Sequence, residues 1–264
     1  MEGPKILTVD IENSPTRAHV WGLWKQNVAL SQIDRDWHLL TWAAKWMHED
    51  FVLGDSMFHY KEEYKSHPQS DYYILLSLRD LLDEADIVVG WNSKAFDVPK
   101  INARMIEWGM EPPSPFQQID AMQIAKKNFR FTSNKLQYVA QALGMGSKLD
   151  TGGFELWTSC MDGDPKAWAK MLEYNMMDVE LTEDVYLALR PWSKSHPNYS
   201  LYVKDGVENR EMMCNKCGSE DLVRYGYAYT NLGKFQEYHC KSCGCYPRGR
   251  KNLKNLENVL TNVI

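Results

Sequence analysis

The sequence predicts an α/β protein with a small cysteine-rich module near its C-terminal end. Three observations indicate this organisation. Strand-like runs rich in apolar and β-branched residues occur at 5–12 and 86–92. A long segment with apolar residues at helical spacing occupies 166–189. Two Cys-x-x-Cys pairs follow, at 214–217 and 240–243.

The composition is typical of a globular chain that can bury a full α/β core. Its 264 residues are 44% hydrophobic and 25% charged. No run approaches the length of a membrane span, and the chain enters a predicted strand almost at once rather than a secretory signal. We therefore expect a cytoplasmic protein with no membrane partner, built as one main domain and one small module.

The first predicted strand, 5–12, carries two acidic residues on one face. Side chains alternate along a strand with a period of two, so Asp10 and Glu12 point the same way. The strand is terminated just beyond them by the turn signal at 13–15. The two acids can be solvated carboxylates of an edge strand, but acids among apolar neighbours at the end of a strand indicate a metal site.

The second strand-like run, 86–92, precedes a helical segment that reaches about Trp108. Asn92 ends the strand, and Asp97, directly after Phe96, opens the helix. An aspartate at a helix start often only caps the helix or interacts with its dipole. From these residues alone, capping is the favoured role of Asp97, and Asn92 can equally be structural.

The late helical segment, 166–189, places Tyr174 and Asp178 four residues apart on one face. The phenol and the carboxylate can therefore face the same site. A tyrosine packed on the core beside a solvated aspartate is a common alternative for any single pair of this kind. By itself, this motif does not identify a site.

Together and in this order, the three motifs resemble those of the DEDD exonucleases, 3′→5′ exonucleases of the ribonuclease H-like superfamily. Position 173, five before Asp178, is Glu rather than His, which matches the tyrosine-bearing branch. The connecting residues 119–122, 133–136 and 142–144 resemble those of exonucleases related to the proofreading domains of family B polymerases. The resemblance covers roughly residues 5 to 192.

The resemblance implies a ribonuclease H-like mixed sheet flanked by helices and a two-metal exonuclease site. Four carboxylates would hold two Mg²⁺ or Mn²⁺ ions, directly or through water: Asp10, Glu12, Asp97 and Asp178. Tyr174 would orient the attacking water, because a phenol with an ordinary pKa near 10 acts mainly as a hydrogen-bonding group near neutral pH. Three further residues are expected substrate contacts: Asn92, Phe96 and Lys135.

The two Cys-x-x-Cys pairs predict a structural zinc site. Four thiolates can close a tetrahedral zinc site, and the glycine after each pair suits a tight turn. The expected ligands are Cys214, Cys217, Cys240 and Cys243. A disulfide framework is disfavoured because no secretory signal is evident and such pairs favour metal in a reducing compartment. His239 and Cys245 are alternative ligands, although an unliganded His and a free Cys are favoured.

The residues between the two pairs have the composition of a β-hairpin. Strand-like stretches at 222–229 and 235–239 flank a turn at 231–233, and the whole resembles a transposase-type zinc ribbon. We therefore expect four segments: an exonuclease domain at 1–192, a linker at 193–210, a zinc ribbon at 211–250 and a basic tail at 251–264.

Charge is unevenly distributed along a chain whose formal charge is −5. From Lys204 onward, ten Lys and Arg against seven Asp and Glu give +3. Arg248 and Arg250 belong to a basic cluster that we interpret as contacting phosphates, the alternative being a solvated, disordered end. Cations and aromatics interleave at 126–131, which suits stacking on unpaired bases, although a half-buried strand is slightly favoured.

Core packing is the expected role of the tryptophans near the N-terminal end. Five of them fall in one stretch: Trp21, Trp24, Trp37, Trp42 and Trp46. The last two belong to the run 39–46, which predicts a central strand.

The sequence as a whole predicts a 3′→5′ exonuclease acting on DNA, with the ribbon helping to hold nucleic acid. A proofreading role would require a polymerase or repair partner. The same chemistry on RNA stays open, because no residue identified here senses a 2′-hydroxyl. A non-catalytic nucleic-acid-binding adaptor is the other alternative, disfavoured because all four acids and the tyrosine are present.

Overall fold

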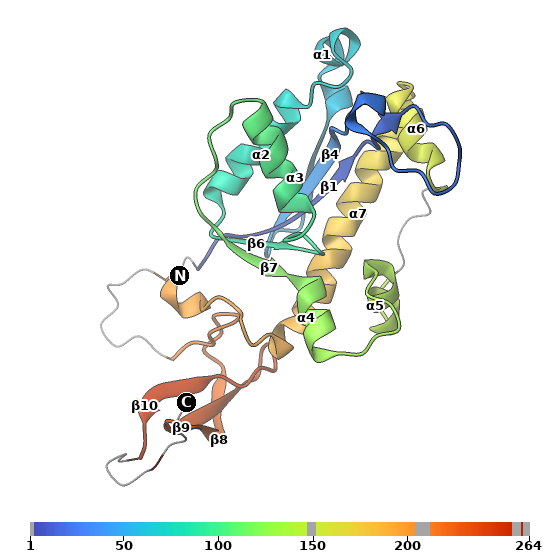
Figure 1. Ribbon diagram of the computed structural model, residues 1–264. Helices are drawn as coiled ribbons and strands as arrows, with labels where there is room; N and C mark the ends of the chain where they lie inside the picture. The colour runs from blue at the N-terminus through green and yellow to red at the C-terminus, as the bar shows by residue number, and fades with distance from the viewer. Residues whose placement is uncertain (1–2, 147–151, 204–211, 255–259, 261–264) are drawn as a thin grey trace. The chain divides into compact units, whose positions relative to one another are not determined.

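The computed structural model describes residues 3–146, 152–203, 212–254 and 260 (Figure 1). The chain divides into two compact units. The first unit is Lys5–Tyr186, and the second combines Met1–Pro4 with Leu187–Ile264. Parts of the expected linker and basic tail lie outside the described residues. Among the described helices, none has the length and apolar character needed to cross a bilayer.

A five-stranded mixed sheet forms the centre of the first unit, in the order β5-β4-β1-β6-β7. β1 pairs antiparallel with β4 and parallel with β6; β5 is antiparallel to β4, and β7 is parallel to β6. The strands are β1 (Ile6–Asn13), β4 (Leu39–Trp46), β5 (Leu53–Ser56), β6 (Ile87–Gly90) and β7 (Gln117–Asp120). The predicted α/β class and the three strands expected from the sequence are confirmed.

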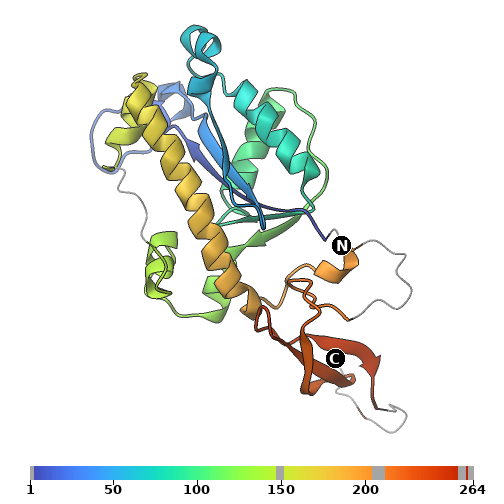
Figure 2. The same ribbon diagram turned by 180° about the vertical axis from the view of Figure 1, so that it is seen from behind.

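Helices cover both faces of this sheet, with α2 and α3 on one side and α7 crossing the other (Figures 1 and 2). Neighbouring residues of β4 show the two sides: Trp42 donates from its indole to Ser77 on α2, and Thr41 donates to Asn175 on α7. The helices are α1 (Lys61–Ser66), α2 (Tyr72–Glu84), α3 (Asp97–Glu107), α4 (Ala121–Asn128), α5 (Leu136–Ala142), α6 (Glu155–Met161) and α7 (Pro165–Leu189).

α7 lies close against the sheet at Gly54 of β5. A Cβ at this position would lie 2.9 Å from Leu172 Cδ1 and 3.3 Å from Met176 Cγ. Both of these contacts come from α7, so any larger residue at 54 would push against the helix. Glycine here sets how closely α7 approaches the sheet.

Residues 17–35 leave the sheet after β1 and form a separate ribbon of β2 (Arg17–Ala18) and β3 (Ile33–Arg35). The expectation of core packing is wrong for Trp21 and Trp24, whose exposed fractions are 95% and 85%. Both lie in the connection between these two short strands, away from any apolar layer. Three tryptophans do contribute to the core as expected: Trp37, Trp42 and Trp46.

The segment 126–131 is not the half-buried strand that its composition slightly favoured. Lys126 and Lys127 form the exposed last turn of α4. Asp120 caps this helix, its side chain accepting a hydrogen bond from the backbone of Gln123 at 3.2 Å. Buried Ile124 and Ala125 on the opposite side give the segment a helical pattern that the alternating cations and aromatics obscured.

The second unit contains a three-stranded sheet in the order β10-β9-β8. β8 (Leu222–Thr230) and β9 (Gly233–Cys240) form the hairpin expected between the cysteine pairs, which is confirmed. β10 (Arg248–Asn252) adds a third strand that the sequence did not indicate. The basic residues after the second pair therefore extend the sheet as far as Asn252.

Candidate metal centres

Three of the four predicted acids meet on the side of the sheet that faces α7. Carboxylate oxygens of Asp10, Glu12 and Asp178 all lie within 4.8 Å of one another. Asp10 and Glu12 share a face because they alternate along β1, and α7 brings Asp178 onto that face from 166 residues away in the chain. The cluster therefore depends on the packing of α7 against the sheet.

The fourth acid, Asp97, reaches the same region from the first turn of α3. Its Oδ1 accepts a hydrogen bond at 3.3 Å from the backbone N–H of Ile11, the residue between the two acids of β1. Only 4% of Asp97 is exposed, and burial raises the pKa of its carboxyl to about 7. The negative charge of Asp120 also raises the pKa of Asp97. A cation nearby would favour the ionised form.

A fully buried amide, Asn175, positions Asp10. Its Nδ2 donates a hydrogen bond to Asp10 Oδ2 at 2.7 Å, while its Oδ1 accepts one from Thr41 Oγ1 at 2.9 Å. These two hydrogen bonds link β4, α7 and β1, and they fix the direction of the Asp10 carboxylate. Partners of this kind orient metal ligands and tune their affinity.

Sequence reasoning missed Asn175, although a signal was present. Met171 and Val179, four residues to either side on α7, are fully buried, so Asn175 occupies the apolar face of the helix. Asparagine in that position needs hydrogen-bonding partners. The spacing could have identified a buried amide, but nothing in the sequence names Thr41, 134 residues away, as its partner.

Tyr174 lies one helical turn before Asp178, as its spacing predicts, and is half-buried. Its ring contacts Trp157 of α6 edge to face, with centroids 6.3 Å apart and planes at 73°. This contact limits the directions that the phenol can take. Trp157 was not identified from the sequence.

The expected substrate contacts differ in their surroundings. Asn92 has a left-handed backbone (φ 66°), and its backbone N–H donates to Asp120 Oδ1 at 3.1 Å, so it forms the turn after β6. Phe96 is 40% exposed beside Asp97, with the Lys100 ammonium 5.1 Å from its ring centroid. Lys135 is exposed immediately before α5.

The donor set of the acidic cluster fits a divalent cation that prefers oxygen. Hard ions such as Mg²⁺ and Mn²⁺ are bound by carboxylates, and clustered carboxylates that lack a cation repel one another. A buried carboxyl with a raised pKa, such as that of Asp97, adds to this repulsion when it ionises. These residues can hold metal; their identity as ligands stays a prediction.

A second cluster, in the second unit, has the geometry of a tetrahedral sulfur site. Sγ atoms of Cys214, Cys217, Cys240 and Cys243 lie within 4.8 Å of one another, and the Cys214–Cys243 and Cys217–Cys240 separations are both 3.7 Å. Zn–S bonds of about 2.3 Å place tetrahedral sulfurs about 3.8 Å apart. The two separations match this spacing, and the four thiols fit a zinc site.

A fifth thiol, Cys245, borders this cluster. Its Sγ is 3.3 Å from that of Cys214, and the residue is buried. A hydrogen bond from the Cys217 thiol lowers the pKa of Cys214 to about 6. His239 faces elsewhere, because its ring stacks on Tyr246 with centroids 4.6 Å apart. Thus Cys245 is the nearer alternative ligand.

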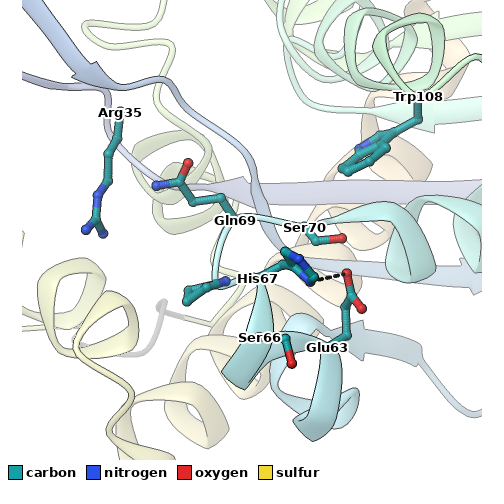
Figure 3. Close-up of a pocket in the computed structure, with 8 residues that line it drawn as sticks. Arg35, Glu63, Ser66, His67, Gln69, Ser70 and Trp108 are labelled. Atoms are coloured by element: carbon teal, nitrogen blue, oxygen red, sulfur yellow. Dashed lines mark ion pairs between the residues drawn. The ribbon is translucent and has the colours of Figure 1, made fainter.

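The hollow drawn in Figure 3 is lined by residues that belong to neither cluster. This cavity of about 590 Å³ is lined by side chains of α1, the following loop, Arg35 and Trp108. Glu63 and His67 form an ion pair at 3.5 Å on its wall. None of the predicted site residues lines it, so we assign it no role in metal binding.

The chain is similar to a known protein family and to a solved structure. A family model described as the RNase_H superfamily matches residues 50–190, which include Asp97, Tyr174 and Asp178. The structure of the family B DNA polymerase from the hyperthermophilic archaeon Pyrobaculum calidifontis is similar with a TM-score of 0.52 and 16% identity. The match covers 71% of this chain and 25% of the polymerase chain, and it concerns the fold. No curated protein matches this chain.

We expect the purified protein to contain one zinc ion per chain, measured by elemental analysis. Cys214→Ser should lose this zinc and unfold the second unit, because its core consists of the cysteines themselves. Cys245→Ser is the matched control and should retain zinc, since four thiolates remain. Zinc retained by Cys214→Ser but lost from Cys245→Ser would reverse the assignment of these two ligands.

We expect Asn175→Ala to weaken Mn²⁺ binding roughly 10- to 100-fold, because Asp10 loses the donor that orients it. Titration calorimetry on protein freed of divalent cations at the acidic cluster, with zinc content checked, measures this. Thr41→Val, which removes only the donor to Asn175, should act in the same direction. Glu180→Gln, an exposed position on α7, is the control. Unchanged affinity in both Asn175→Ala and Thr41→Val would exclude the positioning role.

Proposed function

The chain belongs to the RNase H superfamily, whose model matches residues 50–190, and from this membership we propose that it is a metal-dependent 3′→5′ exonuclease acting on DNA. The observation that carries the proposal is the meeting of Asp10, Glu12 and Asp178 within 4.8 Å, with Asp97 bonded to the backbone between the first two. Three acids from β1 and α7 lie together, and Asp97 of α3 is held beside β1, an arrangement that supports a shared site.

The proposed reaction is hydrolysis of a terminal phosphodiester bond. Two divalent cations, when bound, would activate a water molecule and stabilise the leaving oxygen. The four carboxylates would hold those cations, with Asn175 and the Ile11 backbone N–H keeping two of the carboxylates in place. Because these donors come from β1, α3 and α7, the site is fixed before substrate arrives.

Tyr174 orients the attacking water in this proposal. It lies one turn before Asp178 on α7 and is steadied by the Trp157 ring. A phenol ordinarily stays protonated near neutral pH, so its hydroxyl positions water by hydrogen bonding and does not act as a free base. Phe96 and Lys135, both exposed, are proposed to contact the substrate together with Asn92.

The second unit is proposed to be a zinc ribbon that helps to hold nucleic acid. Its single zinc ion is structural, because four thiolates complete the tetrahedral coordination. Arg248 and Arg250 on β10 would contact phosphates. A reducing cytoplasm would keep the thiols available for zinc. Any proofreading role would require a separate polymerase or repair protein as partner.

The first test is digestion of 5′-labelled single strands of DNA and RNA with matched sequence, in Mg²⁺, in Mn²⁺ or after removal of divalent cations at the acidic site. We expect a metal-dependent ladder that shortens from the 3′ end and is faster on DNA. Asp97→Ala should reduce digestion to background, and Glu180→Gln, also an acidic-to-neutral change, should not.

Faster digestion of the RNA strand would identify RNA as the preferred substrate, with the same proposed active site. Binding of either strand with no cleavage under any metal would contradict the exonuclease and favour a non-catalytic adaptor. A product pattern that begins at the 5′ end would contradict the proposed polarity.

Tyr174→Phe should lower kcat by up to about 100-fold, because a displaced water molecule reacts far more slowly. Phenylalanine keeps the ring and so retains the edge-to-face contact with Trp157, which isolates the effect of the hydroxyl. Mn²⁺ affinity, measured on the same preparation, should stay close to that of the parent. A kcat equal to the parent value would exclude a role for the phenol.

A further inference from the structure

One face of the zinc-ribbon sheet carries a row of aromatic rings. Phe235 and His239 lie on the same face of β9, because residues an even number apart along a strand point the same way. Tyr246 stacks on His239 with centroids 4.6 Å apart, and Tyr225 contacts Tyr246 edge to face at 4.9 Å. Arg248 completes the set, which we name the aromatic face: Tyr225, Phe235, His239, Tyr246 and Arg248.

The rings of the aromatic face are not needed to fill a core. Tyr225 and Tyr246 are 65% and 51% exposed. The buried centre of this unit consists of cysteines instead, with Cys214, Cys240 and Cys245 each at most 1% exposed. Exposed aromatic rings gathered on one side of a sheet are typical of a binding surface.

The charge around the aromatic face is suited to a polyanion. Residues 212–254 contain eight Lys and Arg and three Asp and Glu, a formal balance of +5 before the cysteines are counted. Arg248 lies over the Phe235 ring with its guanidinium carbon 4.1 Å from the centroid, and it is exposed. Glu237, between Phe235 and His239 on β9, is the cross-strand partner of Arg248. The negative charge of Glu237 is thus offset by the positive charge of Arg248.

We propose that the aromatic face is a platform on which the bases of single-stranded nucleic acid stack, while Arg248 contacts the backbone. This inference rests on the proposed function, in which the ribbon holds substrate. Every base has a π-face, so stacking on tyrosine and histidine tolerates any sequence. Bases in a duplex are already stacked on their neighbours, and the platform therefore selects single strands over duplex.

The opposite face supplies a matched control. Tyr229 on β8 is 72% exposed, and its cross-strand partner is Lys234. Lys234 is adjacent to Phe235 on β9, so the two point to opposite faces of the sheet. Tyr229→Ala therefore removes a more exposed tyrosine of the same ribbon without touching the aromatic face.

The experiment measures binding by fluorescence anisotropy with the full chain carrying Asp97→Ala, which prevents digestion. The probes are a labelled single-stranded oligothymidylate, a strand of equal length with abasic sites, and a matching duplex. In this background we compare Tyr225→Ala, Tyr246→Ala and Tyr229→Ala, and we verify one zinc ion per chain in each. A variant without zinc is replaced by the corresponding Tyr→Ser or Tyr→Leu change.

We expect Tyr225→Ala and Tyr246→Ala each to weaken oligothymidylate binding by roughly 5- to 150-fold, as the loss of one stacked base predicts. The same changes should alter binding to the abasic strand by about 2-fold or less, since no base is present to stack. Tyr229→Ala should bind as the parent does, and the duplex should bind more weakly than the single strand.

Three results would overturn the proposal that the aromatic face is a stacking platform. Both aromatic-face variants could bind oligothymidylate as the parent does, in which case the exposed rings serve another partner such as a protein. They could lose equal affinity for the abasic strand, or Tyr229→Ala could be the sensitive variant. Digestion by Tyr225→Ala with Asp97 intact, at saturating substrate, separates the two proposals. If the parent digests DNA but the stacking test fails, the exonuclease proposal stands and the platform proposal falls. If the stacking test succeeds but the parent does not digest, only the platform proposal stands.

Discussion

Carboxylates within 4.8 Å of one another repel, and the first unit must hold three of them there. Unit charges about 4 Å apart near a protein surface repel by about 4 kcal/mol. Asp10 and Glu12 cannot separate, because they are fixed on a strand that is paired on both sides, with β4 and with β6. The opposing carboxylate of Asp178 is fixed on α7. A bound cation relieves this repulsion, as does protonation of one carboxyl.

This constraint explains several features that sequence motifs alone do not. α7 must pack closely on the sheet, and Gly54 allows it to approach β5. Asn175 uses the same approach to reach both Asp10 and Thr41, which ties the helix to two strands by side-chain hydrogen bonds. Asp97 enters from α3 and is buried, and burial raises the pKa of its carboxyl.

The sequence predicted the elements better than the contacts between them. Spacing alone placed Asp10 with Glu12 and Tyr174 with Asp178, since a strand and a helix each have a fixed period. Whether these pairs meet depends on long-range packing, and only the resemblance to a family suggested it. Asn175 and Thr41 were missed because their pairing spans 134 residues. The exposed Trp21 could not be foreseen, because residue type predicts burial only on average.

Charge is divided unevenly between the N-terminal and C-terminal parts of the chain. Residues 204–264 hold ten of the 30 Lys and Arg and seven of the 35 Asp and Glu, so residues 1–203 hold 20 and 28, a formal −8. That part of the chain repels a phosphate backbone. Divalent cations in the acidic cluster would offset the repulsion only locally, because salt screens charges beyond about 8 to 10 Å.

In the proposed function, a nucleic-acid strand is therefore attracted elsewhere on the chain, and residues 212–254, with a formal balance of +5, carry the charge to attract it. Because the ribbon and the acidic cluster belong to one polypeptide, a strand bound to the ribbon would stay at high effective concentration near the acids. No single fixed arrangement of the two units is required. Weak stacking on exposed rings would suit the proposed exonuclease, since an enzyme that advances one nucleotide at a time must release each base that it holds. A ribbon that recognised one sequence tightly would resist such movement, whereas aromatic rings accept every base in turn.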